Sequence, residues 1–353
     1  MDNHFLVLKK LMEYNQDELF YRDYYFAKQS GSRKALQQFL QKQDLQDVKR
    51  RKLLCPELYD IPAEIIDECN YIQMDAANNI YIEKHNRYSP DFEHSHAYFE
   101  SFYVLSGQCT HTIDGVETNL PEGTFCMIAP FKKHRVAVFD DSIVLNIMIQ
   151  RTTFDDMFFN LLRSQNVLSC FFLSNIYPAS KNSFSHIRFA VNDEELEQLI
   201  LSMLLEQTVR DDYTNRILNN LIGVFFTKLV RKYGKTALCY PRDIHKELPN
   251  FEVVTYINKN YKDVTLAGVA EHFHYSEEHC SRLIKATTGT TFTILLRSIR
   301  MRRAETLLLT TGLPANDISY LVGYENPGTF IRLFKREYGM TPAVFRKLHY
   351  SGN

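Results

Sequence analysis

The 353-residue sequence predicts an α+β protein with more than one domain. Three observations lead to this prediction. Apolar residues recur at helical spacing near the N-terminus, short β-prone runs broken by turns fill residues 80–150, and the last hundred or so residues are helical and repeat themselves. We therefore expect an N-terminal helical extension, a small β-barrel with following helices, and an all-α C-terminal domain.

The bulk composition is that of a globular protein. Hydrophobic residues make up 45% of the chain and charged residues 24%. No apolar run approaches the ~18 residues of a membrane span, and acidic and polar residues stand where a signal peptide would be apolar. The seven cysteines include no C-x-x-C pair, so neither a disulfide framework nor a zinc module is indicated. We expect a cytoplasmic protein with no membrane contact and no cofactor.

Residues 1–75 are predicted to form the helical extension. A basic run, Lys49–Lys52, is interpreted as a solvated helix face in preference to a contact with nucleic acid. The apolar residues at helical spacing are Leu6, Leu8, Leu11, Met12, Ala35, Leu36, Phe39 and Leu40.

Residues 76–190 are predicted to form the β domain. Asp114-Gly115 between two β-prone runs is typical of a tight hairpin turn. Several short strands at this spacing indicate a small barrel or sandwich. Residues 151–190 are expected to complete it with mixed elements.

Residues 191–240 are predicted to hold two helices, at 192–210 and 213–233. Asn192 or Asp193 is the expected N-terminal cap of the first. Their apolar stripes either pack on the barrel or pair with a second subunit, and both interpretations stay open. Residues 236–250, with Pro241 and Pro249, are expected to be a linker. The stripes are Leu196, Leu199, Ile200, Met203 and Leu204, and Ile217, Leu218, Leu221, Ile222, Phe225, Leu229 and Val230.

The C-terminal segment, residues 246–353, repeats with a period of about 50 residues. The two copies are residues 266–292 and 315–342, and each has a short apolar helix, a tight turn, and a second helix that ends at a glycine. This is the pattern of a helix-turn-helix unit, whose second helix lies in the major groove of DNA. The segment holds 14 Lys and Arg against 10 Asp and Glu, whereas the remainder holds 27 against 32. This modest asymmetry supports DNA binding as a secondary observation.

Each copy has its own buried stripe and turn. Ser276 is the expected cap of the first recognition helix, and Gly323 suits the tight turn of the second unit. A helix of about 20 residues joins the two units and is roughly 30 Å long, close to one turn of DNA. One chain could then place two recognition helices in successive major grooves. The stripes are Leu266, Val269, Ala270 and Phe273, and Ile318, Leu321 and Val322.

Residues 263–347 resemble the DNA-binding domain of the AraC/XylS family of transcriptional regulators. The resemblance rests on RSIRMRRA at 297–304, ISYLVGYEN at 318–326 and FKREYGMTP at 334–342. It implies seven helices and a transcriptional regulator whose expected partners are promoter DNA and RNA polymerase. Whether the regulator is an activator or a repressor stays open, and the homodimer is expected from the apolar helices between Leu196 and Val230. Pro327 and Gly328 stand where members often carry long polar side chains, so base reading by the second unit is expected to be reduced. The expected DNA-binding residues are Glu278, Ser281, Arg282 and Lys285, and Thr329, Ile331, Arg332, Lys335 and Arg336.

The β domain carries four residues at a distinctive spacing: His94-x-His96-x3-Glu100, followed by His134. Alternate residues of a strand share one face, so His94 and His96 can both point inward. The pattern resembles the cupin fold, in whose enzymes these four positions hold a divalent metal such as Zn, Mn, Fe or Ni. Phe131, where a glycine is usual, and Val138, where enzymes often have Asn, depart from that pattern. A small-molecule pocket without metal is therefore favoured, while metal plus effector and a purely structural role stay open.

The function expected from these residues is that of a DNA-binding transcription regulator that responds to a small-molecule effector, a sugar or a related metabolite. No Ser/His/Asp or Cys/His constellation, Walker loop or GxGxxG motif is present, so no enzyme activity is expected. The alternative is a metal-dependent cupin enzyme that carries a DNA-binding tail. A third hypothesis is a regulator that responds to a partner protein through residues 1–75.

Overall fold

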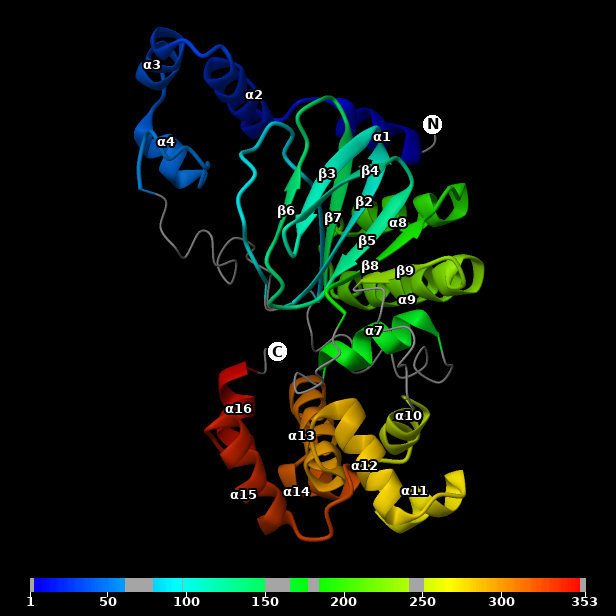
Figure 1. The fold of residues 1–353 in the computed structure, drawn as a ribbon. Helices are drawn as coiled ribbons and strands as arrows, with labels where there is room; N and C mark the ends of the chain where they lie inside the picture. Colours follow the sequence, from blue (N-terminus) through cyan, green and yellow to red (C-terminus); the bar gives the residue numbers. More distant parts are fainter. Residues whose placement is uncertain are drawn as a thin grey trace. The chain divides into compact units, whose positions relative to one another are not determined.

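The computed structural model describes residues 3–60, 79–96, 98–149, 166–176, 184–240 and 251–349 (Figure 1). The chain divides into two compact units. The first holds Met1–Arg151 and Ser185–Tyr240, and the second holds Thr152–Phe184 and Pro241–Asn353. Within the described ranges, no helix has both the length and the apolar character needed to cross a membrane.

The first unit begins with four helices: α1 (Asn3–Met12), α2 (Gln16–Gln29), α3 (Arg33–Gln41) and α4 (Leu45–Arg50). They confirm the helical prediction for this part, whereas residues 61–75 lie outside the described ones. Helix α2 starts with a capping box, because Asn15 and Glu18 exchange side-chain and backbone hydrogen bonds. Within the basic run, Arg51 forms ion pairs with Asp17 and Asp47 of the same unit.

The described residues of the first unit also form nine strands, arranged as two antiparallel sheets. The larger sheet has the order β1-β7-β2-β5-β8-β9 and the smaller one β4-β3-β6. Strand β3 pairs with β4 and β6 alone among the described strands, so the expected barrel is not closed but consists of two separate sheets. The bounds are β1 (Ile80–Lys84), β2 (Phe99–Ser106), β3 (Gln108–Ile113), β4 (Val116–Pro121), β5 (Thr124–Ile128), β6 (His134–Ala137), β7 (Ile143–Ile149), β8 (His186–Ala190) and β9 (Leu238–Tyr240).

Several local predictions for the β domain are confirmed. Asp114 and Gly115 form the β3–β4 turn with φ of 52° and 75°, which is the left-handed geometry of a two-residue hairpin. Strand β8, His186–Ala190, adds to β5, so the end of the segment 151–190 joins the sheet, whereas Thr152–Phe184 falls in the second unit. Residues 238–240, expected in the linker, are strand β9 instead and pair with β8.

Helices α8 (Glu194–Glu206) and α9 (Thr214–Tyr233) close the first unit, and Asp193 caps α8 as predicted. The two helices pack against each other, and α9 also packs on the sheet, because Phe125 of β5 contacts both Phe225 and Phe226 of α9. Ile217, predicted in the apolar stripe, is 39% exposed, whereas Phe226 is buried.

The second unit contains α7 (Val167–Ile176) and the seven helices expected for the C-terminal domain. Gly323 has φ of 90°, and a Cβ atom there would lie 2.3 Å from the carbonyl oxygen of Lys262, so only glycine fits this turn. Leu321, predicted in the buried stripe, is 43% exposed, whereas Ile318 and Val322 are buried. The bounds are α10 (Phe251–Lys259), α11 (Leu266–Phe273), α12 (Glu277–Thr288), α13 (Phe292–Thr310), α14 (Ala315–Leu321), α15 (Pro327–Tyr338) and α16 (Pro342–His349).

Candidate functional sites

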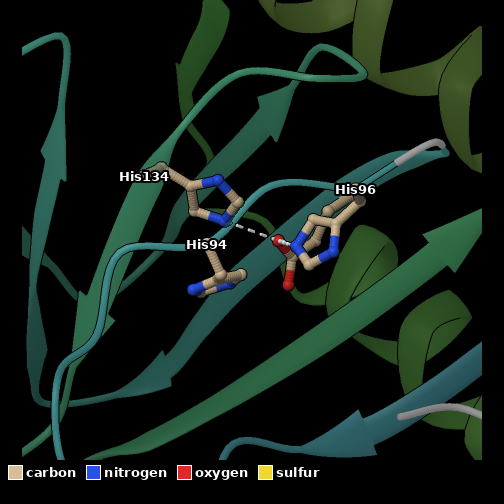
Figure 2. Close-up of side chains that lie close together, drawn as sticks. His94, His96 and His134 are labelled. Atoms are coloured by element: carbon tan, nitrogen blue, oxygen red, sulfur yellow. Dashed lines mark hydrogen bonds and ion pairs between the residues drawn. The ribbon is translucent and has the colours of Figure 1, made fainter. Parts of the chain in front are cut away.

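The structure brings His94, His96, Glu100 and His134 together inside the first unit. One ligand atom from each lies within 4.8 Å of the others. The backbones of His94 and His134 form an isolated bridge, with N–H to carbonyl distances of 3.0 and 2.9 Å. Glu100 comes from β2 and His134 begins β6, so strands of both sheets supply the cluster (Figure 2).

Hydrogen bonds fix the orientation of these side chains. Nε2 of His96 and Nε2 of His134 each lie 2.8 Å from the same Glu100 oxygen, Oε2 (Figure 2). Nδ1 of His94 lies 3.0 Å from the carbonyl oxygen of Phe92, and Nδ1 of His134 lies 3.0 Å from that of Lys132. A carbonyl can only accept, so both Nδ1 atoms carry protons and both Nε2 atoms turn toward the cluster.

Burial and the neighbouring charges set the ionisation of the cluster. Burial raises the pKa of Glu100, but attraction to His96 and the hydrogen bonds from His134 and His96 outweigh it, so the pKa lies well below its usual value. Burial, with repulsion from His134, lowers the pKa of His94. Glu100 is thus a carboxylate at neutral pH, and His94 is a neutral imidazole that can donate a lone pair.

The donor set fits a divalent transition metal. Three imidazoles and one carboxylate are ligands that Zn, Fe, Mn and Ni accept. The carbonyl partners at Nδ1 of His94 and His134 are the outer contacts that orient metal-binding histidines in proteins. If a metal binds here, Nε2 of the three histidines and the Glu100 carboxylate would hold it, and it would supply a Lewis acid.

A cavity of about 80 Å³ adjoins the cluster, and His94 and Glu100 lie in its wall. The N-terminal extension contributes to the same wall through Tyr21 of α2 and through Leu54, whose N–H donates to the Tyr21 hydroxyl. Sequence reasoning did not find these two residues, because nothing in a helical stripe shows which strand residues it will meet. It also missed further polar lining residues: Glu83, Lys84, His85, Asn86 and Asn146.

Phe131 explains one departure from the cupin pattern. Its φ is 62°, a left-handed conformation that glycine adopts freely and a phenylalanine rarely does. Its backbone N–H donates to the carbonyl oxygen of His96 at 2.6 Å. The backbone geometry expected of a glycine is therefore kept although the residue is not glycine.

In the second unit, helices α11 and α12 form the first helix-turn-helix and α14 and α15 the second. Ser276 caps α12 as predicted, and Asn326 caps α15. Five of the nine expected DNA-binding residues are cations, and all five are exposed: Arg282, Lys285, Arg332, Lys335 and Arg336. Glu278 is also exposed, whereas Ser281, Thr329 and Ile331 are half-buried, and Ile331 packs against the domain core.

Comparison with known protein families gives two matches. A helix-turn-helix domain matches residues 269–348, and a cupin domain matches residues 80–148. A chain that joins these two domains falls in the class of regulators with a DNA-binding domain and a cupin sensor.

Relatives support the same class. The transcriptional activator RhaS of Yersinia pestis is 26% identical over 258 residues, which is 72% of this chain and 88% of RhaS. The bifunctional transcriptional activator/DNA repair enzyme AdaA of Bacillus subtilis is 33% identical over 125 residues. That match covers 33% of this chain and 58% of AdaA, so the chain spans little more than half of that relative. The two domain matches and these relatives agree with the resemblance to the AraC family of transcriptional regulators.

Solved structures give two further similarities. The C-terminal domain of AraT, a response regulator from Geobacillus stearothermophilus, is 36% identical over 29% of this chain and 86% of that one, with a TM-score of 0.28. ToxT from Vibrio cholerae, bound to a substituted butenoic acid, is 16% identical over 76% of this chain and 98% of that one, with a TM-score of 0.33.

Proposed function

We propose that this protein is a sequence-specific transcription activator whose cupin unit binds a small-molecule effector. The observation that carries the proposal is the pair of equivalent cations on the two recognition helices. Arg282 and Lys285 on α12 correspond to Arg332 and Lys335 on α15, and all four are exposed. A repeated arginine and lysine on the second helix of each unit is what base reading and phosphate contact require.

The first unit supplies the candidate effector site at His94, His96, Glu100 and His134. Imidazoles and a carboxylate can orient a polar ligand by hydrogen bonds. The adjoining cavity of about 80 Å³ is smaller than the roughly 300–1,000 Å³ of typical ligand pockets. A sugar or related metabolite would thus require the cavity to widen on binding.

The metal-dependent enzyme remains the second candidate, because one observation favours it. Nδ1 of His94 and of His134 is held by backbone carbonyls, which leaves the Nε2 atoms for a metal. Metal content measured together with turnover of candidate substrates separates an enzyme from a metal-free sensor.

Assembly and partners complete the proposal. Promoter DNA is the macromolecule bound by α12 and α15, and activation in the cytoplasm requires contact with RNA polymerase. A homodimer formed through the α8–α9 region would place two DNA-binding domains on repeated half-sites.

The test begins by mapping the promoters that the full chain binds, and continues with binding to the mapped operator. Arg282→Ala is expected to cost roughly 1–3 kcal/mol and to relax selectivity at one base position. Lys335→Ala is expected to weaken binding to all DNA sequences alike and to make the affinity for DNA less dependent on salt concentration. Arg216→Ala, which removes an exposed arginine of α9, is the control. Unchanged affinity and selectivity in Arg282→Ala would show that α12 does not read the groove.

A further inference from the structure

Arg188 of β8 is a buried cation in the first unit, with 8% of its surface exposed. Its guanidinium reaches the opposite sheet, where Nη2 lies 3.5 Å from Nδ1 of His111 on β3. It also lies over the ring of Tyr240, 4.9 Å from the centroid. The side chain is thus enclosed by both sheets.

This cation has no anion beside it in the described part of the chain. The ion pairs found there leave Arg188 out, and its Nε has no hydrogen-bond partner. The acidic groups on which the charge of Arg188 acts include the thiols of Cys109 and Cys126. Burial raises the pKa of Cys109 to about 12 and that of Cys126 further, so both thiols are neutral. No ion pair among the described residues therefore neutralises the guanidinium.

Two histidines beside Arg188 are also incompletely bonded. His111 and His186 have ring centroids 5.6 Å apart, and Nε2 of each is buried without a hydrogen-bond partner. Burial, with the charge of Arg188, lowers the pKa of His186 to about 3. Burial, with repulsion from His134, His186 and Arg188, also holds the pKa of His111 well below its usual value. Both rings are neutral, and each can offer an N–H to a ligand.

Such an arrangement is costly unless a ligand completes it. A buried charge without a partner costs several kcal/mol, and buried polar atoms normally have partners. One guanidinium N–H and two imidazole nitrogens are left unsatisfied in one place. A single anion with several oxygens would pair with the charge and accept from all three groups.

We propose that Arg188, His111 and His186 bind the anionic group of the effector, a carboxylate or a phosphate monoester. The inference rests on the proposed function, because it assigns a chemical class to the effector of the same unit. His111 lies 6.0 Å, centroid to centroid, from His134 of the His/Glu cluster. A ligand held by its charge at Arg188 could thus reach the cluster with its polar body, which favours an ionised metabolite over a neutral sugar.

The experiment measures calorimetric unfolding and binding of the full chain with three probes: propionate, glycerol phosphate, and uncharged glycerol. One of the two anions is expected to raise Tm in a saturable way, and glycerol is not. The anion that raises Tm shows whether the ligand carries a carboxylate or a phosphate. Arg188→Gln removes a charge-assisted hydrogen bond to the anion. It is therefore expected to weaken binding of that anion by about 10- to 100-fold.

The matched control is Arg135→Gln, which removes an exposed arginine of β6 and is expected to bind the anion as the wild type does. Without ligand, Arg188→Gln is expected to melt no lower than the wild type, because it removes an unpaired buried charge. A lower Tm would make Arg188 structural and overturn the inference. His186→Gln, which keeps the buried cation and removes one imidazole, is the second variant, and it is also expected to bind the anion more weakly.

Two results separate this inference from the proposed function. If the wild type binds its mapped operator but neither anion gives a saturable shift, the anion site is wrong and the regulator stands. If the wild type binds no promoter DNA, the proposed function itself fails, whatever the anions do.

Discussion

Glu18 is a buried carboxylate that joins the N-terminal helices to the segment after β1. None of its surface is exposed, and it accepts from Lys84 at 2.6 Å, from Arg87 at 2.8 Å and from the Asn15 N–H at 2.9 Å. Burial raises the pKa of Glu18, but the hydrogen bonds from Arg87 and Lys84 outweigh it, so the pKa lies below the ordinary 4.5. The ionised form is therefore stabilised by folding.

Glu18→Gln is expected to lower the free energy of unfolding of the first unit by about 3–5 kcal/mol, because it leaves Arg87 buried without its anion. Urea unfolding at pH 7 measures the change. Glu117→Gln removes an exposed carboxylate of β4 and is expected to stay within about 0.5 kcal/mol of the wild type. Equal stability of the two variants would contradict the role given to Glu18.

The same carboxylate predicts a pH dependence. A group whose folded pKa lies below its unfolded value contributes stability that is full above the unfolded pKa and is lost as pH falls through the folded one. The wild type should thus lose stability steeply below pH 4.5, whereas the Glu18→Gln curve should be flatter there.

His96→Ala tests the effector site. It is expected to abolish the effector response while operator binding without effector stays intact, because the DNA-binding helices lie in the other compact unit. Metal content after dialysis is measured on the same samples. His4→Ala, which removes a histidine that bonds to Ser202 and not to the cluster, is the control.

Two outcomes would change the assignment. Loss of folding together with DNA binding in His96→Ala would make the residue structural. Stoichiometric metal in the dialysed wild type, lost in His96→Ala, would place a metal at the cluster.

At this scale the sequence predicted the His/Glu cluster but not its surroundings. The spacing of His94, His96 and Glu100 along one short segment is local, so the sequence motif could find it. The expectation that His94 and His96 alternate along a strand was wrong, because both precede β2 and His94 makes only an isolated bridge. Arg188 and Tyr21 reach the interior of the unit from chain segments about 90 residues after and 70 before, and no local pattern encodes such meetings.

Among the elements, α13 sets the separation of the two DNA-binding units. It has 19 residues and is thus about 28 Å long at 1.5 Å per residue, against roughly 34 Å for a turn of DNA. Its inner face is in the domain core, where Met301, Ala304 and Leu308 pack with Ile318 and Phe330. The helix is therefore a fixed spacer and not a tether.

Inserting five base pairs between the two subsites of the mapped operator is expected to reduce affinity to that of one unit, since the second subsite moves to the opposite DNA face. Inserting ten is expected to leave affinity equally low, because the spacer cannot lengthen by a full turn. Gel-shift titration measures both, with a five-base-pair insertion outside the site as the control. Recovery of affinity with ten base pairs would show a flexible connection.

Helix positions were predictable because caps and periodicity are local, as Ser276 and Asp193 show. The burial of individual helix residues was less predictable than the position of the helix. Ile217 and Leu321 lie at the margin of their stripes, and the neighbouring elements determine that they are exposed.

For the whole molecule, an exposed apolar face bears on assembly. Tyr213, the N-cap residue of α9, and Ile217 and Val224 within the helix are 67%, 39% and 43% exposed. Their separations of four and seven residues place them on one face of the helix. An exposed apolar face of this kind is the surface on which we base the proposed homodimer.

Val224→Glu is expected to convert a dimer into a monomer, because a charge in an apolar interface loses its hydration. Sedimentation at tens of micromolar measures the mass. Val116→Glu, the same change at the exposed tip of the β3–β4 hairpin, should remain dimeric. A wild type that sediments as a monomer, with and without DNA, would contradict the dimer.

The overall architecture followed from the sequence apart from the closure of the barrel. Alternation and turns predict strands, but closure depends on which strands pair at the edges, and pairing is a long-range property. Strand β9 is an example. Leu238–Tyr240 is too short to be predicted as a strand from the sequence, yet it pairs with β8 in the larger sheet.

The burial of Glu18 also has a consequence for synthesis on the ribosome. Arg87 follows Glu18 by 69 residues. At roughly 5–20 residues per second, it is polymerised about 3–14 seconds later. Helix α2 thus leaves the ribosome with its carboxylate still hydrated, and it can dock only after the first strand and the loop behind it have emerged. The N-terminal helices are synthesised first but dock late. In a nascent chain stalled before residue 87, proteases should therefore be able to cleave α2.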